Sequence, residues 1–484
     1  MARTKRVTRV KARATTTSTI LAWEDDPLSL RDKTQPIERP VPALTLRLQL
    51  KIRGPEPTPQ HYSLGTSEFR HWTAAEALRR GADLWTALLP ANTRWFTGKS
   101  LPVTLDAGED FNAFYDRKGL SFFHGTAAGV AVFSGESPDV VCHELGHAVL
   151  DALRPQLWDA ASDEVAAFHE SFGDMSAILS GLQLESLRKA VVSDTHGKLY
   201  RSSRLSRLAE QLGWAIRQIQ PDAAEMDCLR NAVNSLFYQD PQTLPPDGPA
   251  SRLTSEPHSF SRVFTGGFFE ALAGMFRIQR SAPNADDLAV AARDMGKLLV
   301  TGIAAAPVVP DYYSQVAAQL IAADDLLFKR KYRDVLKGAF VRRGILSLEA
   351  AAGLSPSTVG ATRSMVAARD RSVGTVTAAL PRMHFSANHL GLGRRDLVVA
   401  VPAQPRSLHV SSAAIDLGPA QPPAGEKAAL SFINDLFRRG RVDTAGHADP
   451  ESGLVHPFIR KTHELVAEDD HVGLRRHTFD CGLD

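Results

Sequence analysis

The spacing of apolar residues changes along this chain and divides it into regions of different predicted structure. Residues 44–53 alternate between apolar and polar side chains, which predicts a strand, and short strand-like segments continue to about residue 137. A capped amphipathic helix is expected between them, at residues 72–89. Farther along, apolar residues recur mainly at helical spacing. We therefore expect an α+β fold, with a mixed sheet-and-helix N-lobe at 44–155 and an all-helical C-lobe at 156–347.

Both ends of the sequence differ from this pattern. The first twenty residues contain six basic and no acidic side chains and no long apolar run, so we expect a disordered basic arm over residues 1–43. Residues 348–484 are expected to form a C-terminal extension of unknown function. Within the extension, strands are predicted near 397–402 and 408–412, and an amphipathic helix is predicted at 427–438.

The most specific chemical pattern is the sequence His143-Glu144-Leu-Gly-His147. Residues four apart share one face of a helix, so His143 and His147 can present two imidazole nitrogens to one tetrahedral metal ion. Glu144 adjoins the first histidine and is placed to take a proton from a water molecule at the metal's open position. This pattern predicts a zinc site with Glu144 as general base. A buried helix that carries two histidines by chance is the alternative.

The next predicted helix supplies two carboxylates at the same spacing. Glu170 and Asp174 interrupt an otherwise apolar helix, where unpaired charges would be costly. A catalytic zinc ion takes three protein ligands, and its histidines usually donate their other nitrogen to a carboxylate. We therefore predict Glu170 as the third ligand and Asp174 as the partner of His143. Glu164 and His169 are rival ligands on other faces of this helix.

With these two helices the chain resembles the thermolysin-like gluzincin metallopeptidases, whose pattern is HExxH followed by ExxxD on the next helix. Metzincins need HExxHxxGxxH, but leucine stands at positions 150 and 153, and the GxMEN motif of aminopeptidases is absent. The resemblance covers roughly residues 45–347. It implies a two-lobed zincin fold with one catalytic zinc ion in the cleft, held by His143, His147 and Glu170.

The resemblance also assigns residues outside the metal helices. Asn112 to Tyr115 correspond to the family's substrate-binding edge strand, along which an extended peptide forms backbone hydrogen bonds. A later series of matching residues implies that Arg230 supports the pocket beyond the scissile bond. It also implies that His258 stabilises the oxyanion, where one preorganised donor is worth about 3 kcal/mol. The implied substrate-binding residues are Asn112, Ala113, Tyr115, Val140 and Leu229, the last two as walls of an apolar pocket.

The chain departs from the family's pattern at two places. The family has a tyrosine between its two metal helices that donates to the oxyanion, but residues 148–169 contain no tyrosine, and Trp158 is the nearest large polar-tipped aromatic residue. The family's acidic calcium-binding cluster is also not reproduced, although Asp139 matches one of its positions. We therefore expect no calcium ion, because hard cations need several oxygen ligands.

Composition limits the remaining classes of protein. The 484 residues are 43% hydrophobic with a net charge of +2, which is typical of a globular enzyme and gives no reason to expect a nucleic-acid partner. No stretch is long and apolar enough to span a membrane, and no signal peptide is recognisable, which predicts a cytoplasmic protein or one exported by a non-classical route. The oligomeric state is left open.

The three cysteines, Cys142, Cys228 and Cys481, imply no disulfide framework. The spacing of the histidines in the extension fits no metal-ligand template: His447, His456, His463, His471 and His477.

We therefore predict a zinc-dependent neutral endopeptidase that cleaves a peptide or protein substrate before hydrophobic residues. The alternative is a catalytically silent homologue that binds peptides and keeps zinc for structure. The missing tyrosine favours that alternative, and the retention of Glu144 opposes it. A third hypothesis is an enzyme domain directed at one specific protein by residues 348–484. That extension could instead fold against the cleft and inhibit it.

Overall fold

A strand pair packs against the first helix. The computed structural model describes residues 19–29, 34–353, 379–392, 396–403, 424–444, 460–468 and 470–482. Strand β1 (Thr19–Ala22) pairs antiparallel with β2 (Ile37–Pro40) and contacts helix α1 (Ser67–Leu88), and Ile20 is fully buried in the core. The predicted disordered arm is therefore wrong for residues 19–29 and 34–43, because apolar side chains of β1 complete the core beside α1. Residues 1–18 lie outside the described residues.

The N-lobe sheet has five strands, and one of them comes from the far end of the sequence. The strands lie in the order β16, β5, β6, β4 and β3. Strands β3, β4 and β6 are parallel, whereas β5 runs antiparallel to both β6 and β16. The predicted strand at 44–53 is shorter than expected because the chain turns before it, with Leu48 at a φ of 57°. The bounds are β3 (Gln49–Ile52), β4 (Ser100–Thr104), β5 (Ala113–Tyr115), β6 (Leu120–Phe122) and β16 (Phe479–Asp480), with a separate hairpin of β7 (His124–Ala127) and β8 (Val130–Phe133).

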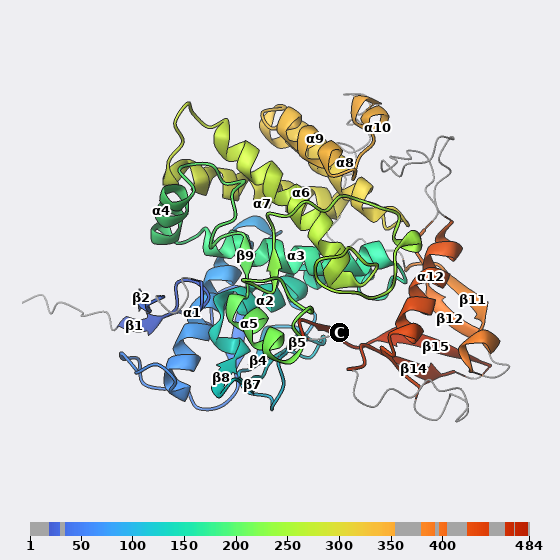
Figure 1. Ribbon diagram of the computed structural model, residues 1–484, viewed down its shortest axis with the longest axis horizontal. Coiled ribbons are helices and arrows are strands. Elements are labelled where there is room, and N and C mark those ends of the chain that lie inside the picture. Colours follow the sequence, from blue (N-terminus) through green and yellow to red (C-terminus); the bar gives the residue numbers. More distant parts are fainter. Residues whose placement is uncertain are drawn as a thin grey trace, which may run out of the picture.

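Helices α2 (Pro138–Leu153) and α3 (Asp163–Gly181) pack against each other at the centre of the molecule (Figure 1). Each begins at a serine cap: the Ser137 side chain accepts a hydrogen bond from the Val140 N–H, and the Ser162 side chain accepts one from Val165. The helices approach closely at Gly146, where an added Cβ would stand 2.9 Å from the Cα of Gly173. This close approach brings the polar residues of both helices opposite each other.

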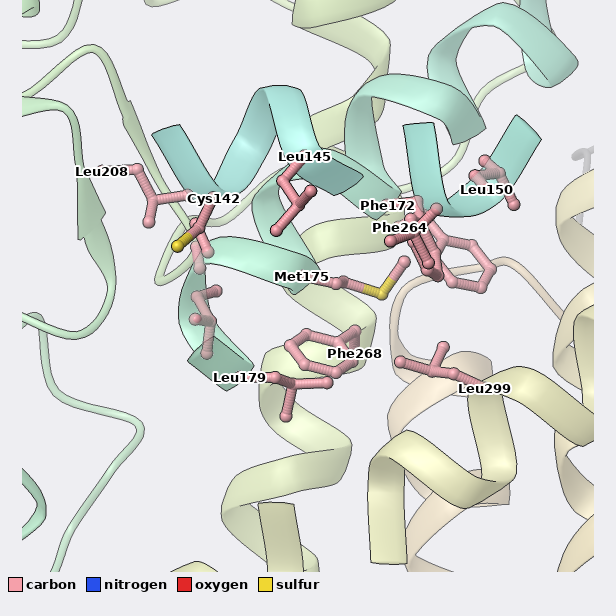
Figure 2. Packing of buried hydrophobic residues seen from close by; sticks show 14 of the residues in the cluster. Cys142, Leu145, Leu150, Phe172, Met175, Leu179, Leu208, Phe264, Phe268 and Leu299 are labelled. Carbon is pink, nitrogen blue, oxygen red and sulfur yellow. The ribbon is translucent and has the colours of Figure 1, made fainter. Parts of the chain in front are cut away.

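The C-lobe is helical. Helices α6, α7 and α8 all contact α3, and their apolar side chains fill the core between them, as Figure 2 shows for Phe172, Met175, Phe264, Phe268 and Leu299. None of the helices in the described part of the chain is long and apolar enough to cross a membrane. The predicted α+β fold, with a mixed-sheet N-lobe followed by a helical C-lobe, is confirmed. The remaining bounds are α4 (Glu185–Asp194), α5 (Glu210–Ile219), α6 (Pro257–Arg277), α7 (Ala285–Ala305), α8 (Tyr312–Phe328), α9 (Arg333–Arg342), α10 (Leu348–Gly353), β9 (Arg207–Leu208), β10 (Arg230–Asn231) and the 3-10 helices η1 (Ser134–Glu136), η2 (Pro155–Leu157), η3 (Pro241–Thr243) and η4 (Asn388–Leu390).

The described part of residues 379–476 forms a separate module with its own apolar core. Its five-stranded sheet has the order β11, β12, β15, β14, β13, and α12 packs against it (Figure 1, orange and red). The module contacts the C-lobe where the Ala161 N–H donates to the Ala400 carbonyl at 2.9 Å. The strand predicted near 408–412 lies outside the described residues. The bounds are β11 (Arg382–Ser386), β12 (Asp396–Ala400), α12 (Gly425–Arg438), β13 (Val442–Asp443), β14 (His463–Ala467) and β15 (His471–Arg476).

Asp163 is buried near Asp435 of the module, so its titration tests the contact between the module and the C-lobe. Burial, reinforced by the nearby Asp435, raises the pKa of Asp163 to about 8. The folded chain therefore binds this proton more tightly than the unfolded chain. The resulting stability is present below about pH 4 and is lost as the pH rises towards 8. We expect Asp163→Asn to reduce the fall in Tm between about pH 5 and pH 8, by about 1 °C for each kcal/mol removed. Thermal unfolding against pH measures this. The exposed Asp286→Asn is the control, and equal slopes in both variants would contradict the assignment.

Candidate metal centre

The three predicted metal ligands meet where α2 faces α3. The Nε2 atoms of His143 and His147 are 3.1 Å apart. One carboxylate oxygen of Glu170 is 3.2 Å from His143 Nε2, and the other is 3.7 Å from His147 Nε2. All three side chains are buried. They form one group that is able to hold a metal ion.

The spacing within this group fits zinc. Nitrogen and oxygen ligands lie about 2.0–2.1 Å from zinc, so two ligands of a tetrahedral site stand about 3.3 Å from each other. The observed separations of 3.1, 3.2 and 3.7 Å bracket that value. Burial lowers the pKa of His147 to about 3, so its ring is neutral and keeps a lone pair for a metal ion.

Glu170 keeps its negative charge in this buried place. Burial alone would raise the pKa of this carboxyl group, but the neighbouring His258 and His147 hold the pKa well below its usual range. Buried charges in proteins are paired or coordinate metals. An ionised carboxylate beside two imidazole rings is a donor set suited to a divalent cation.

Each of the two histidines has a partner on its other ring nitrogen. His143 Nδ1 is 3.0 Å from Asp174 Oδ1, and Arg230 donates to the same oxygen at 2.9 Å. Arg230 and His143 together lower the pKa of Asp174 to about 2, against the effect of its burial. His147 Nδ1 is 3.1 Å from His169 Nδ1, so His169, the rival ligand of the sequence analysis, lies behind His147. Partners of this kind fix the tautomer and orientation of metal-binding histidines.

The other rival ligand, Glu164, lies away from the metal group. Its carboxylate accepts a hydrogen bond from the Tyr238 hydroxyl at 2.6 Å and one from the Tyr313 N–H at 2.8 Å. Glu164 therefore links α3 to other parts of the C-lobe.

Glu144 lies beside the three ligands and faces the cleft. Burial raises the pKa of its carboxyl group to about 7, although the adjacent His143 opposes the shift. Its Oε1 atom is 2.7 Å from the Sγ atom of Cys481, and its Oε2 atom has no hydrogen-bond partner in the described part of the chain. A carboxyl group with a pKa near neutrality is suited to accept and return a proton.

His258, in the first turn of α6, turns its ring towards the same group. Its Nε2 atom is 3.2 Å from Glu170 Oε2 and 2.6 Å from the backbone carbonyl oxygen of Asp480. Its Nδ1 atom is 2.8 Å from the N-cap residue Glu256, which fixes the ring. His258 is therefore placed to donate a hydrogen bond to a peptide carbonyl beside the metal group.

The predicted substrate strand pairs with the segment that carries Cys481. The Ala113 carbonyl accepts a hydrogen bond from the Cys481 N–H at 2.9 Å, so β5 offers its outer edge to an extended segment. The Asn112 side chain lies against Gly482, where an added Cβ would stand 2.5 Å from the Asn112 Cγ. Tyr115 turns into the core, and its hydroxyl donates to Asp151 at 2.9 Å. Only the backbone of Tyr115 faces the edge.

A pocket of about 580 Å³ adjoins His258 and Cys481. Leu229 and Arg230, which the sequence analysis assigned to the specificity pocket, are among its lining residues, and that assignment stays a prediction. Val140 is buried in α2 and is not among the lining residues, because the start of α2 packs into the core. The pocket combines apolar side chains with charged residues of both signs: Ile216, Ala223 and Ala250; Arg262, Arg439 and Arg441; Asp222, Asp247 and Glu256.

Trp158 does not replace the family's tyrosine. Its ring is buried, and its Nε1–H donates to the Arg476 carbonyl of the module at 3.1 Å. This donor therefore holds the module to the C-lobe and does not face the metal group.

Sequence reasoning missed Phe479 and Cys481, both of which lie against the centre. Cys481 forms a group with His143 and Glu144 in which the potential ligand atoms lie within 4.8 Å of one another. The Phe479 ring stacks on His169 with centroids 4.0 Å apart. The sequence signal for this contact was the histidine and cysteine content of the extension. No sequence spacing relates those residues to the metal ligands of α2. His447 and His456 lie outside the described residues.

A separate group of carboxylates lies near the start of α2. Asp26, Asp139 and Glu210 each place an oxygen within 4.8 Å of the others, and burial raises the pKa of all three. Asp139 is the position that the sequence analysis singled out, while Asp26 and Glu210 come from distant segments that local spacing does not connect. The expected absence of calcium stays a prediction.

Fold and site thus define a two-lobed α+β protein with a buried His-His-Glu group that can hold a metal. Among solved structures, the chain is similar to the precursor of protealysin, a metalloproteinase from Serratia proteamaculans. The TM-score is 0.40 at 15% sequence identity, over 70% of this chain and 90% of that chain. No protein-family model matches the chain, and no curated protein matches it. The function proposed below rests on the chain's own residues.

The contact between α2 and α3 predicts a large effect at Gly173. A Cβ there would stand 2.6 Å from ring atoms of His143, closer than side chains tolerate. We expect Gly173→Ala to displace the His143 ring and to weaken zinc binding by about 10–100-fold, as disturbed ligand orientation does. Competition with a fluorescent chelator measures the affinity. Gly181→Ala, on the same helix, meets only a Leu187 side chain at 3.1 Å and is the control. Equal affinities in the two variants would contradict the prediction.

Proposed function

We propose that this protein is a zinc-dependent neutral endopeptidase. The observation that carries the proposal is the meeting of His143, His147 and Glu170 with a partly unpartnered Glu144, beside a strand edge that accepts an extended segment. When bound, zinc supplies Lewis-acid chemistry that polarises a peptide carbonyl and makes a water molecule more acidic. A buried group of this composition has no comparable use in a purely structural core.

Three parts of the chain act on the peptide or on the attacking water molecule, and a fourth holds a metal ligand in position. Strand β5 aligns it through backbone hydrogen bonds, as the Ala113 carbonyl does with Cys481. Glu144 takes a proton from water and passes it to the leaving amine. His258 Nε2 donates to the carbonyl oxygen as that oxygen becomes negative. Arg230 keeps Asp174, and through it His143, in place.

The residue after the scissile bond enters the pocket beside His258. Leu229 provides an apolar wall there, which supports the preference for hydrophobic residues at this position.

Hydrolysis of an unstructured protein such as casein tests the proposal. The zinc-loaded full chain is assayed beside the variant Phe479→Ala/Cys481→Ser, because these two residues lie in the cleft. We expect one zinc ion per chain and cleavage that a chelator abolishes and added zinc restores. If each protein bound one zinc ion and neither cleaved casein, the peptidase proposal would be wrong. A peptide-binding function would then be the remaining candidate.

The second candidate is a silent peptide-binding module. It is favoured by the strand already seated on β5 and by the engagement of Trp158, which leaves His258 as the oxyanion donor. Against it, Glu144 lies outside the His143–His147–Glu170 group, and a module that only binds peptides needs no general base there. A labelled peptide that binds the double variant without being cut would support this candidate.

A further inference from the structure

Residues 479–482, the insert segment, occupy the place of a peptide substrate. Phe479 and Asp480 form β16, which pairs antiparallel with Tyr115 and Phe114 of β5. The next N–H, that of Cys481, donates to the Ala113 carbonyl at 2.9 Å. In Figure 1 the red strand leaves the module and ends beside β5. The segment thus fills the edge that the proposed function reserves for substrate.

The Asp480 peptide group lies at the position of a scissile carbonyl. Its carbonyl oxygen accepts from His258 Nε2 at 2.6 Å. Its side chain is held by Arg441 at 2.8 Å and lies 3.9 Å from Arg460, both residues of the module. The carbonyl is therefore fixed from both sides, by the catalytic unit and by the module.

The Cys481 thiol lies beside His143, one of the three proposed ligands, and beside Glu144. Its sulfur is 2.7 Å from Glu144 Oε1 and within 4.8 Å of a ring nitrogen of His143. Sulfur is a preferred zinc ligand at about 2.3 Å, and a site with four protein ligands is closed to water. The sulfur also contacts Glu144 Oε1, an oxygen of the carboxylate that would accept a proton from the attacking water molecule.

Phe479 anchors the segment. Its ring stacks on His169 with a 4.0 Å centroid distance and an interplanar angle of 16°, and on His147 at 5.1 Å. The Arg476 guanidinium lies 4.0 Å from the centroid of the same ring. This side chain is 2% exposed, so the segment is packed as part of the core and does not rest on the surface.

We propose that the insert segment is a built-in inhibitor, which fills the peptide-binding edge of β5 and supplies the Cys481 thiolate as the fourth metal ligand. The proposal rests on the zinc-peptidase function above. Cys481 would hold the metal ion as its thiolate, and the thiol proton would pass to the Glu144 carboxylate, so no oxidant or reductant is required. The sulfur excludes water and Glu144 is occupied, which is why a strand placed like a substrate is not cut.

The module gives the segment its advantage over free peptides. A tethered segment acts at an effective concentration on the order of millimolar, whereas peptides bind typical enzymes at 1 μM–1 mM. Because Arg441 also holds Asp480, the segment is presented in its bound conformation. Displacement of the segment is therefore the step that turns the enzyme on.

Cobalt in place of zinc tests the sulfur ligand without any activity assay. The full chain loaded with Co²⁺ is expected to show a near-ultraviolet thiolate-to-cobalt absorption that Cys481→Ser abolishes. Cys142→Ser and Cys228→Ser are the controls and retain the absorption, because both thiols are buried away from the cleft. Cobalt bound without a Cys481-dependent absorption overturns this proposal alone. No cobalt bound overturns the proposed function as well.

Hydrolysis of casein then tests inhibition. Phe479→Ala/Cys481→Ser is expected to cleave at least about tenfold faster than the unaltered chain at the same zinc content. Arg475→Ala is the matched control, since this exposed residue pairs with Glu464 on the neighbouring strand, and it leaves the rate unchanged. Equal rates in all three proteins overturn inhibition. Loss of residues 481–484 from the zinc-loaded chain, seen by intact mass, also overturns it, because the segment would then be a substrate.

Discussion

Replacing Glu144 by glutamine is expected to lower peptide hydrolysis by about 10²–10⁴-fold and to leave one zinc ion bound, because the loss is that of a general acid–base group. The side chain keeps its size, so α2 and the ligands His143 and His147 stay in place. What is removed is the carboxylate whose Oε2 atom has no partner in the described part of the chain and whose pKa burial raises to about 7.

The measurement is made in the Phe479→Ala/Cys481→Ser background, where the cleft is accessible to substrate. Zinc content by mass spectrometry and the rate of peptide cleavage are recorded on the same samples. Glu76→Gln is a control, because it removes a buried carboxylate of α1 that contacts Arg39 and Arg80 away from the cleft. If the Glu144 variant cleaved at the parent rate, the carboxylate would have no part in proton transfer and the proposed function would fail.

The metal group was predictable because its information is local. His143, His147, Glu170 and Asp174 lie on two consecutive helices, and helical spacing alone places each pair on one face. The capping serines and the following Pro155 also mark where these helices begin and end. Only the packing of α2 on α3, made close by Gly146 and Gly173, remained to be supplied by the structure.

The occupied cleft was not predictable, because its contacts join distant segments. Phe479 pairs with Tyr115, and Cys481 with Ala113 and Glu144, across most of the chain. A two-residue strand has no periodicity that a sequence pattern detects. The same limit explains the missed strand β1, which has only four residues and pairs with the separate strand β2.

Two side chains took directions that the resemblance could not give. Tyr115 alternates away from the β5 edge into the core, where Asp151 satisfies its hydroxyl, so its position in the motif overstated its contact with substrate. His169 faces His147 from behind, although helical spacing alone put it on another face of α3. Both side-chain directions depend on which buried polar groups need a hydrogen-bond partner, and those partners come from other helices and strands.

Replacing Glu170 by glutamine is expected to weaken zinc binding by more than about 100-fold, exceeding the 10–100-fold typical of changes in the outer partners of a ligand. The amide keeps the size of the side chain but removes the one negative charge among the three ligands. It also leaves His258 Nε2, 3.2 Å away, without its carboxylate partner. Hydrolysis at limiting zinc should fall in proportion to the bound metal.

Glu164→Gln is the matched control for this change. It lies on the same helix α3 and is also buried, but it serves Tyr238 and Tyr313 in the C-lobe. Zinc affinity, measured by chelator competition, should stay near the parent value there. Thermal stability should fall by about 0.5–1.5 kcal/mol, because the amide keeps only one oxygen to accept the hydrogen bonds from Tyr238 and Tyr313. If Glu164→Gln lowered the zinc affinity and Glu170→Gln did not, Glu164 would be the metal ligand and the assignment of Glu170 would be wrong.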